Sequence, residues 1–193
     1  MDLTAQKILV AGASGLIGRA VVKRFHEAGC KEILTPTHSE LDLEDAAKVS
    51  AFFQSQKPDL VVLAAGKVGG ILENKSKPIE FLTRNLAIQM NVCAAADLIG
   101  TSRVVLFGSS CMYPKECPQP MSEEMLGTGK LEPTSLSYAT AKIAGLQLEL
   151  AFQVSFPILF QSIHSEPEPL GAVRFQFTRF FSVYNDAKMT ARI

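Results

Sequence analysis

Two residues in the segment "SYATAK" could transfer a proton. Tyr138 and Lys142 lie four positions apart, which places them on one face of a helix. An ammonium group close to a phenol favours the phenolate and lowers the phenol's pKa from about 10, so the pair could donate a proton to a carbonyl oxygen near neutral pH. The same spacing is common in ordinary surface pairs, so the pattern alone leaves both interpretations open.

The segment "GSSCMYPKE" (108–116) places Ser109 and Cys111 directly after the apolar run "RVVLFG". A thiolate there, near the cationic Lys142 and a helix end, would have its pKa lowered from about 8.5 toward neutrality. A small buried hydrophobe is the commoner fate of a free cysteine. The cysteines form no CxxC pair and have no histidine at ligand spacing, so neither disulfide nor metal site is predicted. The remaining cysteines are interpreted as core or loop residues: Cys30, Cys93 and Cys117.

A glycine-rich segment, "GASGLIG" (12–18), follows the first apolar run and opens a helical pattern. Gly12 permits a tight turn, Gly15 lets a pyrophosphate approach the backbone, and Gly18 lets helix and strand pack closely. The spacing is one residue looser than the GxGxxG fingerprint, but its place between strand and helix favours a dinucleotide site over a structural turn. The predicted cofactor contacts at this loop and after the third apolar run are Gly12, Ala13, Ser14, Gly15, Leu16, Ile17, Gly18, Ala64 and Ala65.

The residues at the end of the second apolar run (32–37) help to distinguish an NAD site from an NADP site. NAD sites carry an acidic residue there for the ribose 2′-hydroxyl, whereas this chain has His38 and no carboxylate before Glu40. A 2′-phosphate would be repelled less by this sequence, which favours NADP(H). Asp42 and Leu43 are predicted to line the adenine. An exposed loop histidine and a helix N-cap at Asp42 explain the same residues equally well.

The elements that must position these residues alternate along the first 150 positions. Short apolar runs at 7–12, 32–37, 59–65 and 103–108 predict strands covered on both faces, and amphipathic stretches follow each of them. The third helix is expected to start near Ser76, with Pro78 in its first turn, and to end at Gly100. The residues expected on its inward face are Ile79, Leu82, Leu86, Met90 and Cys93. This order predicts an α/β fold with a doubly wound parallel sheet, a Rossmann domain over residues 1–150 with ligands at the carboxyl ends of its strands.

Residues 151–193 differ in composition. They contain seven phenylalanines of the twelve in the chain, together with Pro157, Pro167 and Pro169, and show no clear period. A strand at 154–160 is possible but weak because Pro157 would lie inside it. We expect a divergent, irregular tail over these residues.

The bulk composition excludes several partners. The chain has 19 basic and 19 acidic residues, so its charge balance attracts neither nucleic acid nor an anionic membrane. No apolar run approaches the roughly 18 residues that a membrane helix needs, and the N-terminus lacks a leader pattern. The expectation is a soluble, cytoplasmic protein.

Four segments together resemble the GDP-L-fucose synthase family, the GDP-4-keto-6-deoxymannose 3,5-epimerase/4-reductases of the extended short-chain dehydrogenase/reductase superfamily. They are "ELDL" (40–43), "LAAGKVGGI" (63–71), "GSSCMYPK" (108–115) and "LEPTSLSYATAKIAGL" (131–146), and the likeness covers about residues 5–150. The resemblance implies that Ser109 holds the substrate carbonyl, that Tyr138 transfers the proton and that Lys142 also contacts the nicotinamide ribose. It further implies that Cys111 is the base in epimerisation and that Asn85 braces the site.

The same resemblance implies NADP(H) as cofactor, a GDP-linked nucleotide sugar as substrate, and a homodimer through helices around 78–99 and 137–150. The chain departs from the family at Ser14 and His38, where some relatives have arginines, and from about residue 151, where the family's histidine acid and sugar-binding lobe do not appear. His164 does not match that acid. We therefore expect a truncated form with impaired activity. The alternatives are a non-catalytic NADP-binding module that pairs with full-length subunits, and another nucleotide-sugar epimerase or dehydratase.

Overall fold

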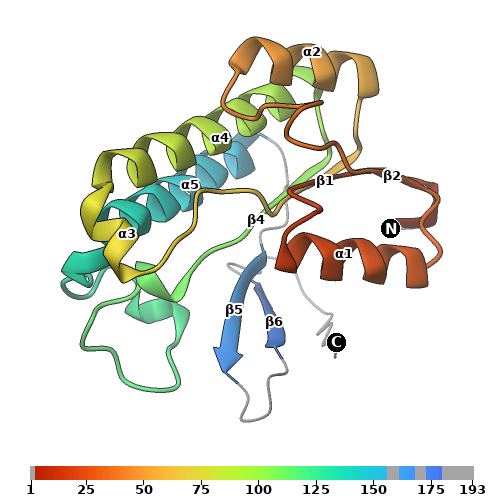
Figure 1. Cartoon of the computed structure of the whole chain (residues 1–193). Coiled ribbons are helices and arrows are strands. Elements are labelled where there is room, and N and C mark those ends of the chain that lie inside the picture. The colour runs from red at the N-terminus through yellow and green to blue at the C-terminus, as the bar shows by residue number, and fades with distance from the viewer. Residues whose placement is uncertain (1–2, 156–160, 168–172, 180–193) are drawn as a thin grey trace.

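A four-stranded parallel sheet forms the centre of the molecule (Figure 1). The computed structural model describes residues 3–155, 161–167 and 173–179. The strands run in the spatial order β2-β1-β3-β4, and every neighbouring pair is parallel. Their bounds are β1 (Lys7–Ala11), β2 (Glu32–Leu34), β3 (Leu60–Leu63) and β4 (Arg103–Leu106). The predicted Rossmann-type sheet is confirmed, with each strand shorter than the apolar run that contains it.

Helices cover both faces of this sheet (Figure 1). They are α1 (Leu16–Glu27), α2 (Ala46–Gln56), α3 (Ile71–Ser76), α4 (Pro78–Ile99) and α5 (Leu136–Ser155). Alternate strand residues enter two separate cores, because successive side chains point to opposite faces. Ile8 and Val10 pack with the apolar residues of α1, whereas Leu9 and Val61 pack with those of α2, α4 and α5. Both faces are therefore buried, as the continuous apolar runs predicted.

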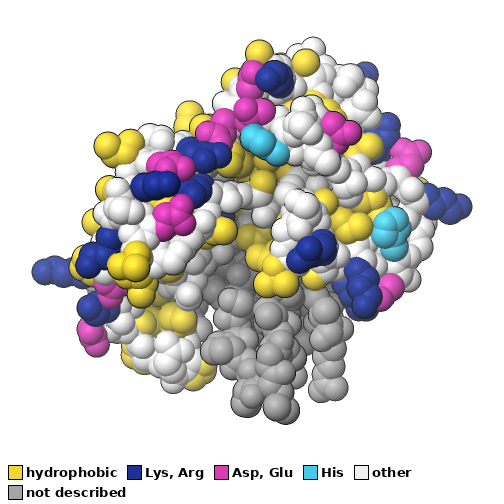
Figure 2. Space-filling view, in the orientation of Figure 1, with side chains coloured by type: hydrophobic (Ala, Val, Ile, Leu, Met, Phe, Trp, Pro, Cys, Tyr) yellow, Lys and Arg dark blue, Asp and Glu magenta, His cyan; other side chains and the backbone are white. Residues whose placement is uncertain are grey.

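Helix α4 buries a different face from the one predicted. Cys93 is buried as expected, but Ile79 is 76% and Met90 55% exposed. The buried side contains Phe81 and Val92 instead, together with polar residues. Figure 2 shows apolar side chains left exposed over α3 and α4. Because α4 is apolar on two sides, periodicity alone could not select the face that meets the sheet.

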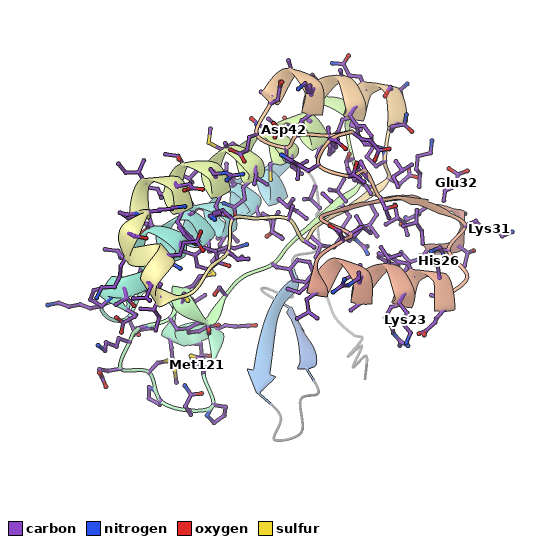
Figure 3. The ribbon with its side chains drawn as sticks, viewed as in Figure 1. Lys23, His26, Lys31, Glu32, Asp42 and Met121 are labelled. Carbon is purple, nitrogen blue, oxygen red and sulfur yellow. The ribbon has the colours of Figure 1, made fainter. Side chains whose placement is uncertain are left out.

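The start of one helix differs from prediction, and one short helix was not predicted. Asp45 caps α2, and its Oδ1 accepts hydrogen bonds from the backbone of Ala47 and Lys48, both at 3.1 Å. Asp42 lies earlier in the loop before α2 (Figure 3), where its Oδ1 accepts from the Glu44 backbone at 3.0 Å. The prediction of Asp42 as the cap was therefore wrong by three positions. Helix α3, which is too short to show a period, was not predicted.

An antiparallel pair of strands follows α5. Its members are β5 (Gln161–Pro167) and β6 (Val173–Arg179), and both lie in the stretch where the sequence showed no clear period. The possible strand at 154–160 is wrong for its first two residues, which belong to α5. Its remaining residues, 156–160, lie outside the described part of the chain.

Candidate active site

The turn after β4 fixes the position of Cys111. Ser109 has an extended backbone and caps the single helical turn Ser110–Met112. Its hydroxyl oxygen accepts a hydrogen bond from the Cys111 backbone at 3.2 Å, and its own N–H donates to the Met112 sulfur at 3.3 Å. These hydrogen bonds fix the backbone of Cys111 relative to Ser109 at the carboxyl end of β4.

Tyr138 and Lys142 lie in the first turns of α5, which packs along α4. The Tyr138 ring meets the fully buried Phe81 of α4 edge to face, with centroids 6.4 Å apart and planes at 82°. Such contacts hold an aromatic ring in one orientation. The Lys142 ammonium nitrogen lies 5.8 Å from the centre of the Tyr138 ring.

The Tyr138 phenol shares its surroundings with Ser109 and Cys111. Burial raises the pKa of Tyr138, and a negative charge on the Cys111 thiolate raises it further, whereas a hydrogen bond with the Ser109 side chain lowers it. The net direction is upward, so the phenol keeps its proton near neutral pH. A Cys111 thiolate therefore favours the form of Tyr138 that can donate a proton.

This electrostatic arrangement differs from the one predicted. Lys142 was expected to lower the Tyr138 pKa, but its ammonium donates instead to the Phe107 carbonyl at 2.9 Å. The side chain is partly exposed along its length, whereas its nitrogen is desolvated, and this desolvation lowers the pKa of Lys142 to about 8. The direction predicted for the Tyr138 pKa was wrong because burial dominates.

Cys111 and Tyr138 both line a pocket of about 740 Å³, here called the Tyr138 pocket. Its wall includes residues that the sequence analysis missed. Asn74 is only 8% exposed, and its amide nitrogen donates to the Gly69 and Gly70 carbonyls at 3.0 and 3.1 Å. These two bonds fix which end of the amide carries oxygen. Asn74 Oδ1 has no hydrogen-bond partner among the described residues, so it remains an unused acceptor in the wall.

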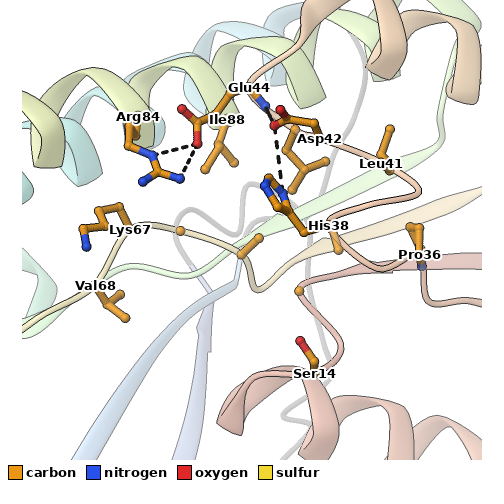
Figure 4. Close-up of a pocket in the computed structure, with 15 residues that line it drawn as sticks. Ser14, Pro36, His38, Leu41, Asp42, Glu44, Lys67, Val68, Arg84 and Ile88 are labelled. Carbon is orange, nitrogen blue, oxygen red and sulfur yellow. Dashed lines mark hydrogen bonds and ion pairs between the residues drawn. The ribbon is translucent and has the colours of Figure 1, made fainter.

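A second pocket, of about 300 Å³, lies over the glycine loop and is here called the glycine-loop pocket (Figure 4). Val68 lines both pockets, so the two spaces meet there. The predicted cofactor residues that line the glycine-loop pocket are Gly12, Ser14, His38, Asp42, Leu43 and Ala65. Three others, Ala13, Ile17 and Ala64, are half-buried, pack against the core and do not line this pocket. Leu16 is 70% exposed.

Two glycines of the loop are required by the geometry. Gly12 has φ +87°, and a Cβ there would lie 2.6 Å from the Ala65 backbone nitrogen. Gly18, in the first turns of α1, would place a Cβ against the Gly12 carbonyl oxygen. The tight turn at Gly12 and the close packing at Gly18 therefore agree with the roles expected for them. Gly15 is the N-cap of α1, next to the free N–H groups of that helix.

At the far end of the glycine-loop pocket, His38 Nδ1 lies 4.0 Å from Asp42 Oδ1 (Figure 4). The His38 side chain is 76% exposed, as a surface loop position would predict. Opposite it, Arg84 of α4 pairs with Glu44 at 2.7 Å and with Glu80 at 3.1 Å. The arginine joins the loop before α2 to α4, an ion-pair connection that the sequence analysis did not predict.

Asn85 of α4 holds the loop between the two pockets. Its Oδ1 accepts from the Lys67 backbone at 2.9 Å, and its Nδ2 donates back to the Lys67 carbonyl at 2.9 Å. The Lys67 ammonium in turn pairs with Glu73 of α3 at 2.6 Å. Asn85 thus braces a loop that borders both pockets, which is the supporting position expected for it.

The described residues contain no cluster of three or more side chains suited to a metal ion. Within the same residues, no helix is both long enough and apolar enough to cross a membrane.

The four cysteines are all free thiols; Cys30 and Cys93 are buried, while Cys111 and Cys117 are half-buried. Burial raises the pKa of Cys93 to about 12, in agreement with its interpretation as a core residue.

Curated proteins with similar sequences match most of this chain. GDP-L-fucose synthase 1 of Arabidopsis thaliana is 47% identical over 154 residues, which is 80% of this chain and 48% of that protein. GDP-L-fucose synthase of Escherichia coli strain K12 is 41% identical over 146 residues, covering 76% and 46% of the two chains. The chain therefore spans about half the length of the curated relatives that it matches.

A solved structure matches the same region. MlghC, a GDP-mannoheptose C4 reductase from Campylobacter jejuni with NADP bound, has 34% sequence identity and a TM-score of 0.79, covering 83% of this chain and 51% of its own. The family model for the NAD dependent epimerase/dehydratase family matches residues 8–163. That match covers well over half of the chain, so the protein belongs to the NAD-dependent epimerase/dehydratase family.

Proposed function

We propose that this chain provides the cofactor-binding and proton-transfer half of an NADP-dependent epimerase/reductase that converts GDP-4-keto-6-deoxy-D-mannose to GDP-L-fucose. The observation that carries the proposal is that Cys111 and Tyr138 line one pocket, that Ser109 hydrogen-bonds with Tyr138, and that this pocket shares Val68 with the glycine-loop pocket. Relatives named GDP-L-fucose synthases support the choice of substrate.

The glycine-loop pocket fits a dinucleotide. Gly12 and Gly18 bring the loop and α1 so close that no Cβ could be accommodated, and this leaves backbone N–H groups at the start of α1 accessible to a pyrophosphate. Asp42 and Leu43 lie where an adenosine would extend. The NADP bound to the Campylobacter jejuni reductase supports NADP(H) as the cofactor here.

Each side chain then has a proposed role. The Cys111 thiolate removes a proton from a carbon next to the ketone, which leaves an enolate, and a proton added on the opposite face completes each inversion at C3 and C5. NADPH, when bound, supplies a hydride to C4. Tyr138 donates its proton to the C4 oxygen while the Ser109 hydroxyl holds that oxygen in place. Lys142, desolvated beside the Tyr138 ring, would bind the nicotinamide ribose.

The proposed role of Cys111 favours this reaction over that of another nucleotide-sugar epimerase or dehydratase, because two inversions next to a ketone need a base at that position. The acid that returns the proton is not assigned. His26 lines a pocket on the outside of α1, and His38 lies in the glycine-loop pocket. Because residues 151–193 do not carry the family's sugar-binding pattern, we expect this chain by itself to turn over its substrate slowly.

We further propose that the chain forms a homodimer through α4 and α5. Apolar side chains of α4, of α3 and of the loop before α3 remain more than half exposed in the single chain: Val68, Ile71, Leu72, Ile79, Met90 and Leu98. Leu136, at the start of α5, is 49% exposed. Exposed apolar surface of this extent is typical of an interface.

The same surface favours the second candidate function, a non-catalytic NADP-binding module that pairs with full-length subunits. The free thiols support a location in the cytoplasm.

A titration followed by a turnover assay tests the proposal. We expect NADPH to bind with a change in nicotinamide fluorescence, and the keto-sugar then to cause slow loss of NADPH absorbance. Binding without any loss of NADPH at high protein concentration would favour the non-catalytic module. A chain that does not bind NADPH would contradict both candidate functions.

A further inference from the structure

A third pocket, of about 600 Å³, opens along the outer side of α1 and is here called the α1 pocket. The hydroxyl residues Ser14 and Thr35 line one end of it, and Arg19 lies in the second turn of the helix that forms its wall. Lys23 and His26, farther along α1, line it as well (Figure 3). Ser14 also lines the glycine-loop pocket, so the two pockets meet at this residue.

The basic side chains of α1 differ in their partners. Arg24 pairs with Glu27 at 2.7 Å, and Lys23 lies 3.9 Å from the same carboxylate. Arg19 is exposed and has no carboxylate within ion-pair distance among the described residues. Arg19 is therefore a cation that lines the same pocket as Ser14 and forms no ion pair among the described residues.

The loop after β2, which contains His38, supplies little positive charge to the glycine-loop pocket. His38 lies 4.0 Å from the Asp42 carboxylate, and Glu40 stands nearby with its carboxylate hydrogen-bonded to Thr37. Two carboxylates within this loop oppose a dianionic group. A 2′-phosphate bound here needs a permanent cation from another element.

We propose that Arg19, together with the hydroxyls of Ser14 and Thr35, binds the 2′-phosphate of NADP and makes this chain select NADP over NAD. This inference rests on the proposed function. A guanidinium can donate two parallel hydrogen bonds to phosphate oxygens, which gives both charge and direction. The positive charge that some relatives place on the glycine loop and after the second strand is provided here by α1.

Affinity measurements for NADPH and NADH test this role without any need for turnover. The unaltered chain should bind NADPH more tightly than NADH, as followed by nicotinamide fluorescence. Arg19→Gln should weaken NADPH binding by about 10-fold to 100-fold, the effect of losing a charge-assisted contact, while the Kd for NADH changes by less than about twofold. Raising the salt concentration should reduce the preference for NADPH in the unaltered chain more than in the variant.

Arg24→Gln is the matched control, because Arg24 belongs to the same helix and is also partly exposed but pairs with Glu27. It should leave both Kd values within about twofold, as expected for an exposed ion pair. The inference is overturned if Arg19→Gln leaves NADPH binding unchanged, or if it weakens NADH binding equally. An unaltered chain that binds neither dinucleotide would instead refute the proposed function itself.

Discussion

The Tyr138 pocket places its reactive groups on partly buried side chains, whereas the glycine-loop pocket offers mainly backbone and exposed side chains. In the first, Tyr138 is held by the ring of Phe81, and Cys111 is tied to Ser109 by a hydrogen bond. In the second, the shape comes from Gly12 and from a loop in which His38 is 76% exposed. Under the proposed function, a few fixed side chains carry the reaction chemistry, whereas exposed charges carry the selection of the cofactor.

The largest expected effect is on the Tyr138 pocket. Tyr138→Phe removes the proposed proton donor but keeps the ring that meets Phe81. Because general acid catalysis typically contributes about 10² to 10⁴ in rate, the loss of NADPH absorbance with the keto-sugar should fall by that factor. The Kd for NADPH should stay the same, since the glycine-loop pocket is unchanged. A variant that keeps the full rate would remove Tyr138 from the reaction.

A side chain added to the backbone of the glycine loop should lower the free energy of unfolding. Gly12→Ala would force a side chain into a left-handed conformation and against the Ala65 backbone, so we expect unfolding to require about 2 to 4 kcal/mol less free energy. Urea denaturation measures this loss. Gly70→Ala is the control, because a Cβ at Gly70 meets nothing within 4 Å and its φ is −72°. Equal losses in the two variants would contradict the geometric requirement at Gly12.

Lys142 should give the Tyr138 pocket a distinctive pH dependence. Its folded pKa, lowered to about 8 by burial, lies below the unfolded value of about 10.4, so the unfolded chain binds more protons between these values. The contribution of Lys142 to stability therefore increases as pH rises through this window, by about 2 kcal/mol between pH 7 and pH 10. Lys142→Met lacks this titration. We expect the difference in unfolding free energy between the two proteins to shift by that amount in favour of the unaltered chain.

Other groups titrate in the same range, which is why the difference between the two proteins must be compared. Burial raises the pKa of Cys93 and of Tyr113 to about 12, so their contributions to stability decrease as pH rises. These contributions are present in both proteins and cancel. A difference that does not change with pH would show that the ammonium of Lys142 is not desolvated.

Much of the sheet could be predicted from the sequence, because strands buried on both faces give continuous apolar runs with little ambiguity. The face of α4 could not, since Ile79 and Met90 repeat with the same helical spacing as the buried Phe81 and Val92. Burial of the polar Asn85 depends on the Lys67 backbone, which is far from it in sequence. Tertiary partners of this kind leave no local pattern.

In the candidate site too, some features could be predicted from the sequence and others depend on tertiary contacts. Motif spacing was sufficient to bring together Ser109, Cys111 and Tyr138, because parallel strands and the helices after them end at one edge of the sheet. The direction of the Tyr138 pKa was not predictable, because it depends on how deeply the phenol is buried and on where the Lys142 ammonium points. The role proposed for Arg19 could not be predicted from the sequence, because nothing in the glycine motif marks the position that follows it.

Exchange of hydrogen between the keto-sugar and D₂O tests most directly whether Cys111 acts as the base beside Tyr138. The chain is incubated with GDP-4-keto-6-deoxymannose in D₂O without NADPH, and deuterium at C3 and C5 is followed by mass spectrometry over hours, so that slow exchange is detected. The unaltered chain and Tyr138→Phe should both incorporate deuterium, whereas Cys111→Ser should not. Equal incorporation by Cys111→Ser and the unaltered chain would contradict the account.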